Sequence, residues 1–484
     1  MEEQKQPIRV KKKLPLWAVC LITGLLTAVL CAGVLGVLLH YLHSGTPQPT
    51  EPSVSVTEPT TVPTEPSTAP TTEPTTEPTT EPTTEPTEPP IVKESTATIA
   101  AVGDILPHMP ILRSYHNAAT GEYDFNPIFK HFTSYIEKAD YAIANLETTL
   151  GGLGNGFNYM AYPGFNTPDT IADALKNAGF DMLLTANNHS YDTRTKGMMR
   201  TLEVLNNLSL EHLGTKQTPE EPDFIIKEIN GIRIGMICYT YETPNNTEDR
   251  KSLNGIMLTP EASQLVVSYD NQDLPAFYTH AQATLEAMKA AGADATVFFM
   301  HWGPKEYVLQ PVKQHVEMAQ NLCNMGVDVI VGGHPHVIQP VDLLTSQTNP
   351  DHKTVCLYSL GNSLSNQRKW AMDMKSGHTE DGLLVNLTFS RYSDGTVILE
   401  SVDLMPTWVD MIYVEGDIRS YTVYALDKEI EDWKGYYDLS GDSMWQFNES
   451  YQRTMELIGE GQIKIQEYLT QRQAQVEEEL GVTK

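Results

Sequence analysis

The chain has 484 residues, a formal net charge of −29 at pH 7 and 20% charged residues. Its length allows two to three domains, and most of the negative charge falls after residue 94. A region this acidic excludes the broad basic surface with which proteins bind nucleic acid. An anionic substrate would therefore need a local source of positive charge, and metal ions are the obvious one.

The N-terminal segment predicts a membrane anchor. No charged residue occurs from Leu14 to Leu42, a run long enough to cross a hydrocarbon core of about 30 Å, so we predict a transmembrane helix over 14–43. Basic residues cluster in 1–13 and none follows until Lys93. The positive-inside rule therefore predicts a cytoplasmic tail over 1–13 and an extracellular location for everything after the helix.

Two alternatives for this segment are less favoured. A cleavable signal peptide has a shorter apolar core of about 7 to 15 residues. A lipoprotein would use Cys31, but Leu30 stands where a small residue is expected. The other cysteines are sparse and fall in apolar segments, which gives no indication of a disulfide framework.

Residues 44–94 are rich in Pro, Thr and Glu and include the run TTEPTTEPTTEPTTEPTEPP. Such a segment has almost nothing apolar to bury, and its prolines favour an extended backbone. We predict a disordered stalk.

Strands and helices alternate over 95–406. The pattern predicts a layered α/β domain with mixed sheets flanked by helices. The expected strands are Thr96–Val102 and Tyr141–Ala144, the helices are 170–178, 195–207, 279–291 and 314–325, and the hairpins are Phe224–Tyr241, with its turn at Asn230-Gly231, and Gly382–Leu404.

After Pro406 the pattern changes to helical spacing, as in Met444, Phe447, Tyr451 and Met455. This spacing predicts a C-terminal helical appendage over 407–484, packed on the main domain.

Three stretches repeat one arrangement, in which an apolar helix ending at Gly leads to a short strand and then to polar side chains. They are 174–189, 288–303 and 322–336. The carboxyl ends of parallel strands meet at one edge of a sheet, where ligands bind. We therefore expect these stretches to deliver to one pocket Asn188, His189, His301, His334 and His336.

Six polar motifs in all end strand-like segments. Taken alone, Gly103-Asp104 is an ordinary turn and His301-Trp302-Gly303 an aromatic corner. Together, carboxylates, imidazoles and an amide suit Mn, Fe or Zn in a site for two divalent ions. The motifs contain Asp104, Asn145, Glu147, Asn188, His189, His301, His334, His336 and Asn362.

Across about Thr98 to Gln367 the chain resembles the CapA family of capsule-synthesis proteins, also called the poly-γ-glutamate biosynthesis family, which is similar to calcineurin-like metallophosphoesterases. The matching runs include AAVGDILPH, ANLETTL, LLTANNHSYDTRTKG, VFFMHWGPKEY, VIVGGHPHVIQPV and YSLGNSLSNQ. The resemblance implies a metallophosphoesterase-type fold and two bound divalent ions.

The resemblance also implies roles for individual residues. Asp104 and His336 would hold the first metal, and Glu147 would bridge the two metals. The second metal would be held by Asn188, His301 and His334. His189 would be catalytic and would protonate the leaving group, a role suited to an imidazole.

Two departures from the phosphoesterase pattern stand out. Leu106 occupies the position of a histidine ligand, which leaves His108 as a possible substitute. Arg194 stands where the family often has Gly. Further candidate site residues are His108, Asn145, Asp192, Arg194 and Asn362.

These observations predict a membrane-anchored extracellular protein acting in capsule or poly-γ-glutamate biosynthesis, through a metal-dependent hydrolase site. Its expected partners are the membrane, a cell-surface polymer or its precursor, and other capsule-synthesis membrane proteins; nucleic acid is not expected. One alternative is a non-enzymatic scaffold subunit for polymer export or anchoring. Another is a phosphatase with a small nutrient substrate.

Overall fold

The computed structural model describes residues 90–154, 156–247, 250–415 and 418–482. The predicted cytoplasmic tail, the predicted transmembrane helix and nearly all of the predicted stalk lie outside these residues. Within the described ranges, no helix combines the length and the apolar character that a membrane crossing requires.

The first sheet is mixed and contains the amino-terminal strand of the domain. Strands β1 to β4 run parallel, whereas β15, β16 and β17 add antiparallel neighbours on the other side of β1. In spatial order the strands are β17 (Ile418–Ala425), β16 (Val397–Glu415), β15 (Asp381–Tyr392), β1 (Lys93–Ile105), β2 (Tyr141–Leu146), β3 (Met182–Leu184) and β4 (Glu211–Leu213), with β14 (Asn362–Leu364) paired to β1.

The second sheet is also mixed, with parallel strands at its centre and antiparallel strands at its two edges. A short separate hairpin joins β7 (Ser252–Leu253) to β8 (Ile256–Met257). In spatial order the strands of the sheet are β12 (Val341–Thr345), β13 (Lys353–Leu357), β11 (Val329–Gly333), β10 (Ala295–His301), β6 (Ile232–Glu242) and β5 (Phe224–Ile229), with β9 (Ser268–Asp270) paired to β6.

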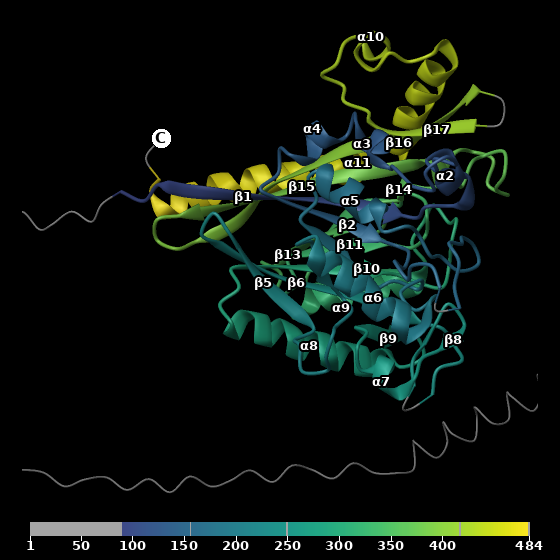
Figure 1. Cartoon of the computed structure of the whole chain (residues 1–484). Helices are drawn as coiled ribbons and strands as arrows, with labels where there is room; N and C mark the ends of the chain where they lie inside the picture. Colours follow the sequence, from purple (N-terminus) through teal and green to yellow (C-terminus); the bar gives the residue numbers. More distant parts are fainter. Residues whose placement is uncertain (1–89, 155, 248–249, 416–417, 483–484) are drawn as a thin grey trace, which may run out of the picture. The chain divides into compact units, whose positions relative to one another are not determined.

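The two sheets pack face to face, and helices cover their outer faces (Figure 1). Apolar side chains that alternate along the strands, such as Ile99 and Ala101 of β1 and Val297 and Phe299 of β10, fill the space between the sheets. The first sheet carries α2 (Met109–Ser114), α3 (Asn126–Phe129), α4 (Thr133–Ile136), α5 (Thr170–Asn177) and α6 (Arg194–Asn207); the second carries α8 (Leu274–Ala290) and α9 (Lys313–Met325).

These layers confirm the predicted mixed α/β architecture. The four predicted helices correspond to α5, α6, α8 and α9, and the two predicted strands are the central parts of β1 and β2. The hairpin of β5 and β6 turns at Asn230-Gly231, where both residues have positive φ, as a tight hairpin turn requires. The remaining short helices are α7 (Pro260–Ser263), η1 (His378–Glu380) and α10 (Trp433–Tyr437).

The helical appendage predicted for 407–484 is wrong over residues 407–425. Here β16 continues to Glu415 and β17 follows it as a further strand of the first sheet. Thr407 pairs with Ala425, and on its other side β16 pairs with β15. These three strands follow one another as hairpins, and β15 joins them to β1, a segment nearly 300 residues away in the sequence, through backbone hydrogen bonds that residue spacing alone does not reveal.

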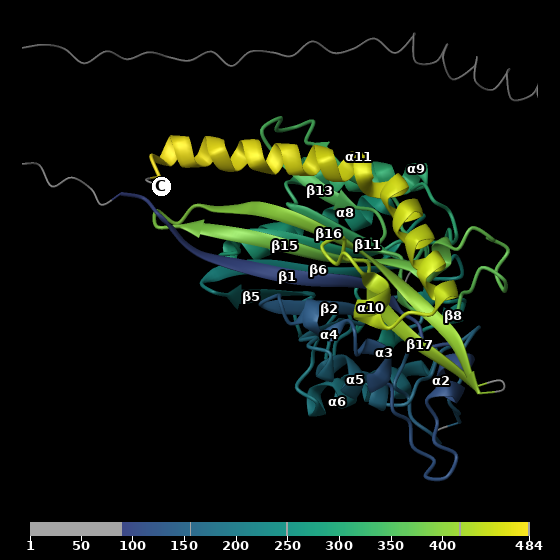
Figure 2. The same ribbon diagram turned by 90° about the horizontal axis from the view of Figure 1, so that it is seen from above.

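After the short α10, most of the rest of this region is one long helix, α11 (Gly441–Leu480), which lies along β16 (Figure 2). It is not an appendage, because Ile458, Ile465 and Leu469 belong to the core between the sheets. At Gly461 the helix backbone approaches β12 so closely that a Cβ would lie 1.8 Å from the carbonyl oxygen of Val341. Glycine at this position therefore permits the contact.

Replacing Arg453 with Ala is expected to destabilise the domain by about 3–5 kcal/mol, because it leaves a buried carboxylate without its charged partner. Arg453 Nε and Nη2 each lie 2.5 Å from a carboxylate oxygen of Asp381, whose side chain is 1% exposed. Chemical denaturation measures the change. The exposed pair of Lys464 with Asp342 provides the control, since Lys464→Ala is expected to cost about 0–1 kcal/mol. Equal effects of the two substitutions would mean that α11 is not anchored through Arg453.

Candidate metal centre

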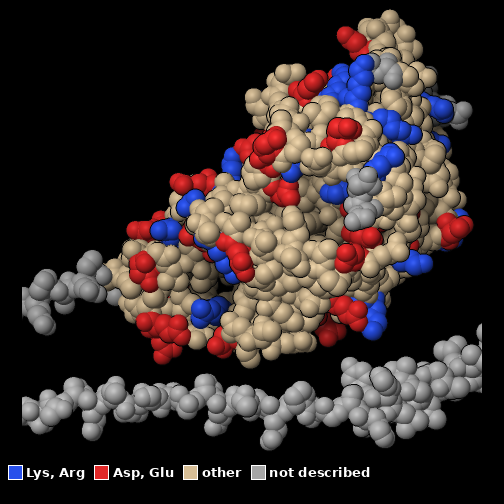
Figure 3. All heavy atoms as spheres, turned by 90° about the horizontal axis from the view of Figure 1, so that it is seen from below, with Lys and Arg blue, Asp and Glu red and all other residues tan. Residues whose placement is uncertain are grey.

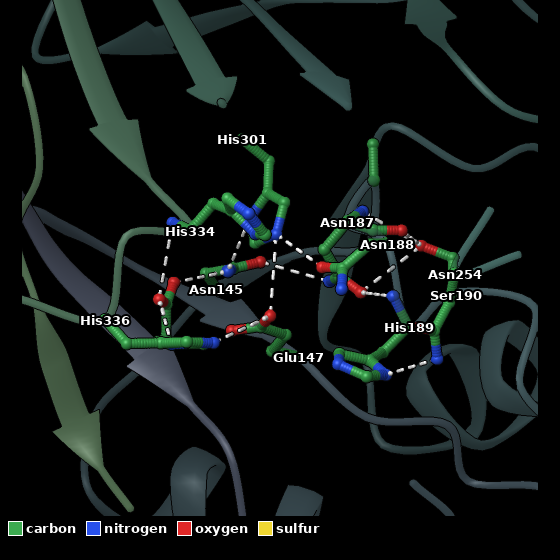
Figure 4. Close-up of polar contacts among 12 residues, drawn as sticks. Asn145, Glu147, Asn187, Asn188, His189, Ser190, Asn254, His301, His334 and His336 are labelled. Atoms are coloured by element: carbon green, nitrogen blue, oxygen red, sulfur yellow. Dashed lines mark hydrogen bonds and ion pairs between the residues drawn. The ribbon is translucent and has the colours of Figure 1, made fainter. Parts of the chain in front are cut away.

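The carboxyl ends of four strands, two from each sheet, bring the predicted polar residues together (Figure 4). Because parallel strands in both sheets end at the same edge, residues far apart in the sequence meet there. Asp104 lies near the end of β1, Asn145 and Glu147 at the end of β2, His301 at the end of β10, and His334 and His336 directly after β11.

Two groups of three side chains could each hold a metal ion, and they share one residue. Glu147, His301 and His334 form one group, and Asp104, Glu147 and His336 form the other; within each group the potential ligand atoms lie within 4.8 Å of one another, and all the residues are buried. Glu147 therefore occupies the position of a carboxylate that bridges two ions.

Unpaired buried atoms provide a test of whether these residues fit metal ions. Among the described residues, both carboxylate oxygens of Glu147 and both ring nitrogens of His334 are buried without a hydrogen-bond partner. Leaving such atoms unpaired is costly unless a ligand satisfies them. Carboxylate and imidazole are ligands that Mn, Fe and Zn accept, so the donor set fits divalent metal ions.

The backbone at the two histidines is also strained. His334 has φ 92° and His336 has φ 56°, in the left-handed region that costs a non-glycine residue about 1–3 kcal/mol. Such strain is typical of functional sites, where the surrounding structure imposes it. Here it turns both imidazoles toward the carboxylates, as the grouped rings in Figure 4 show.

The two carboxylates differ in their electrostatic environment. Burial raises the pKa of Glu147 well above its usual value, and the nearby charge of Asp104 raises it further. Burial also opposes ionisation of Asp104, but the hydrogen bond and the charge of His336 outweigh it and lower the pKa of Asp104. Bound cations would favour the ionised form of Glu147, which suits a bridging ligand.

The histidines also differ in the direction in which their surroundings shift the pKa. Burial lowers the pKa of His301 to about 3 and that of His334 well below its usual value, so both are neutral at pH 7, the form that binds metals. Burial also disfavours the charged form of His336, but Asp104 Oδ2, 3.1 Å from His336 Nδ1, raises the pKa of His336.

Amide side chains hold this centre in place. Asn188 Oδ1 lies 2.7 Å from His301 Nε2, and Asn145 Nδ2 donates to Asp104 Oδ1 at 2.8 Å. Asn187 donates to Asn145 Oδ1 at 3.2 Å, and Asn362 Oδ1 lies 3.2 Å from His336 Nδ1. The structure therefore brings Asn145, Asn188 and Asn362 into the cluster.

His189 lies at the side of the cluster (Figure 4), and Asp192 orients it. Its Nδ1 lies 2.7 Å from Asp192 Oδ2, and its ring packs edge-on against Phe165 at 4.7 Å between centroids. Because the Asp192 carboxylate accepts a hydrogen bond from Nδ1–H, Nε2 is left to carry or release a proton. This arrangement is that of an oriented acid–base histidine.

Asn254 supports the pair formed by His189 and Asp192. It was not among the predicted residues. It lies in the β7–β8 hairpin and donates to Asp192 Oδ1 at 3.1 Å and to the carbonyl oxygen of Pro163 at 2.8 Å. Asp192 Oδ2 also accepts from the backbone N–H of Phe165 at 2.6 Å. No local pattern marks Asn254, because its role depends on a contact across 62 residues.

His108 and Arg194 lie outside the two metal groups. His108 Nδ1 accepts from the backbone N–H of Asn366 at 3.2 Å, and burial lowers the pKa of His108 to about 4. The His108 ring packs against Phe165, at 5.3 Å between ring centroids, and Phe165 in turn packs against His189. Arg194 is exposed with φ 59°, a conformation that favours glycine.

The layered fold and this cluster define a mixed α/β protein with a candidate two-metal centre. Residues 98–367, more than half of the chain, match the model of the family "Bacterial capsule synthesis protein PGA_cap". The chain belongs to this family.

Named relatives agree with this assignment. The capsule biosynthesis protein CapA of Bacillus anthracis is 26% identical over 312 residues, which cover 63% of this chain and 67% of that protein. The PGA biosynthesis protein CapA of Bacillus subtilis (strain 168) is 25% identical over 347 residues, covering 70% and 81%. Among solved structures, the calcineurin-like phosphoesterase YfkN from Bacillus subtilis is 14% identical with a TM-score of 0.35, covering 76% of this chain and 99% of that chain.

Proposed function

We propose that this protein acts in capsule or poly-γ-glutamate biosynthesis as a metal-dependent hydrolase, which cleaves an ester or amide linkage in a cell-surface polymer. The observation that carries the proposal is the pair of buried metal groups that share Glu147. A purely structural cluster would satisfy its buried polar atoms internally. Both carboxylate oxygens of Glu147 and both ring nitrogens of His334 instead lack a hydrogen-bond partner, and His301 Nε2 and His336 Nε2 lie 3.5 and 3.8 Å from Glu147 Oε1.

The residues around the centre divide the chemical work. Asp104, Glu147, His301, His334 and His336 would hold the ions with Asn188. When bound, two divalent ions would polarise the linkage and make a water molecule more acidic. Asp192 accepts a hydrogen bond from His189 Nδ1–H and so orients the ring, which would allow Nε2–H to protonate the leaving group.

We also propose that the domain is anchored to the membrane by residues 14–43 and faces the outside of the cell. The uncharged run from Leu14 to Leu42 and the basic residues that precede it support this topology. Protease added to intact cells should release the domain, whereas cleavage only after lysis would overturn the topology.

The purified full-length chain is expected to contain divalent metal, because the unpaired donors of two buried groups converge. Elemental analysis and titration with Mn²⁺ or Zn²⁺ measure the content, and the assay tests hydrolysis of generic phosphodiesters and of surface-polymer fragments. Absence of metal uptake would refute the metal centre. Metal uptake without any hydrolysis, together with polymer production by inactive variants in a deletion strain, would favour the scaffold subunit instead. Rapid turnover of simple phosphomonoesters alone would favour a nutrient phosphatase.

A further inference from the structure

Exposed aromatic rings and cations alternate on the surface beside the metal centre. The Arg419 guanidinium carbon lies 5.5 Å from the ring centroid of Tyr413 and 5.6 Å from that of Trp370. Lys369, the neighbour of Trp370, places its Nζ 5.2 Å from the ring centroid of Trp445. The three aromatic residues are 55–59% exposed. We call these five residues the aromatic–cation ladder.

A short segment connects the ladder to the metal centre. Gln367 Oε1 accepts from Asn362 Nδ2 at 2.9 Å, and Asn362 Oδ1 lies 3.2 Å from His336 Nδ1. Gln367 Nε2 donates to the hydroxyl of Tyr307 at 3.0 Å, and the Tyr307 ring lies 6.0 Å from that of His336. Lys369 follows Gln367 by two residues, so the segment that carries the ladder begins at a residue bonded to Asn362, which contacts His336.

The strand that carries Arg419 is fixed to the same region. Tyr421 of β17 donates its hydroxyl to Asn366 Oδ1 at 2.6 Å. Tyr115, at the end of α2, donates to the Tyr421 carbonyl oxygen at 2.6 Å, and β17 lies beside α2 in Figures 1 and 2. Since α2 follows β1, the strand that carries Asp104, α2 links β17 and the ladder to the strand that supplies the site.

The chemistry of the ladder fits a chain of carboxylates. The Arg419 guanidinium also donates to the hydroxyls of Tyr421 and Tyr413. A guanidinium has five N–H donors, so those that remain can bind a carboxylate while the group lies against the rings. Lys369 Nζ lies 3.9 Å from a carboxylate oxygen of Glu449. Because this ion pair is long and partly exposed, it contributes little to stability and leaves Lys369 able to bind another carboxylate. Acidic and basic side chains are interspersed on the face shown in Figure 3. Because the protein is acidic overall, an anionic chain needs a local set of cations in order to bind.

We propose that the aromatic–cation ladder binds an extended polyglutamate chain that leads into the metal centre. The inference rests on the proposed function, from which it takes the polymer, and adds the surface that guides it. The rings of Tyr413, Trp370 and Trp445 supply apolar contact for the chain backbone, and Arg419 and Lys369 pair with its carboxylates. An acidic polymer is thereby held although the protein as a whole is acidic.

Binding of soluble polyglutamate to the purified full-length chain tests this proposal. Arg419→Gln and Trp370→Ala are each expected to weaken binding about tenfold, equivalent to about 1.4 kcal/mol. Matched controls replace exposed residues elsewhere: Tyr436→Ala, at 60% exposure, and Lys313→Gln, whose side chain is 89% exposed, should bind as the unchanged protein does. Binding should also weaken as salt is added.

Further arms separate this proposal from the proposed function. His336→Ala alters the metal centre and leaves the ladder intact, so it should retain polyglutamate binding even if no hydrolysis is ever detected. Unchanged binding in both ladder variants, at equal thermal stability, would overturn the proposal. Equal binding of neutral dextran would also overturn it. If the protein bound alginate and did not bind polyglutamate, the proposal that the ligand is polyglutamate would be wrong, and the ligand would be an acidic glycan.

Discussion

Replacing His336 with Ala is expected to remove both bound metal and activity. His336 is one of three side chains in its metal group, and its Nε2 lies 3.8 Å from the shared Glu147. Loss of even an outer partner of a metal ligand weakens binding about 10- to 100-fold, so loss of a ligand should cost at least the upper end of that range. Titration with Mn²⁺ or Zn²⁺ followed by an activity assay measures both effects.

A histidine outside the cluster provides the matched control. His280 Nε2 lies 3.0 Å from Asp223 Oδ2, a pairing that resembles His336 Nδ1 with Asp104 Oδ2 at 3.1 Å. The His280→Ala variant should retain metal and activity, since neither His280 nor Asp223 belongs to a metal group in the described part of the chain. If His336→Ala binds metal as tightly as His280→Ala does, His336 is not a ligand.

Replacing His189 with Ala is expected to reduce turnover about 10²- to 10⁴-fold, the usual contribution of general acid–base catalysis, and to leave the metal content near that of the unchanged protein. The reason is that Asp192 orients His189 as a proton donor, whereas the ligand atoms of both metal groups belong to other residues. Single-turnover kinetics on a polymer fragment and elemental analysis of the same sample give the two readings.

His108→Ala is the control for the loss of packing around His189. Its ring contacts the same Phe165, at 5.3 Å between centroids, but His108 belongs to neither metal group. Turnover should therefore fall far less than in His189→Ala. Equal losses would assign the effect to the packing of Phe165, and a loss of metal from His108→Ala would make His108 a ligand.

The sequence predicted the edge at which the centre lies because the signal is local. In each of the three repeated stretches, an apolar helix and strand precede the polar side chains, and strands that run parallel must end together. The buried β10 shows this directly, since all seven of its residues are buried and its last residue is His301. The hairpin at Asn230-Gly231 was predictable for the same reason, because two adjacent residues determine the turn.

Other features depended on contacts between distant segments. Helical spacing after Pro406 suggested an appendage, but β16 pairs with β15 up to Trp408 and with β17 from Thr407 to Glu415, so both strands belong to the first sheet. Gly459 and Gly461 disfavour a helix locally, yet α11 runs unbroken through both, and at Gly461 its backbone packs closely on Val341. In both places tertiary contacts outweigh the local preference.

The sequence by itself determined the fold class, the family and the residue types offered at the strand ends, because periodicity and motif order are properties of neighbouring residues. Only the tertiary structure decided that Asn254 supports Asp192 and that Arg419 lies against the rings of Trp370 and Tyr413. These contacts join residues brought together by burial of the two sheets. Their distances follow from the packing of the whole domain, which no short stretch of sequence encodes.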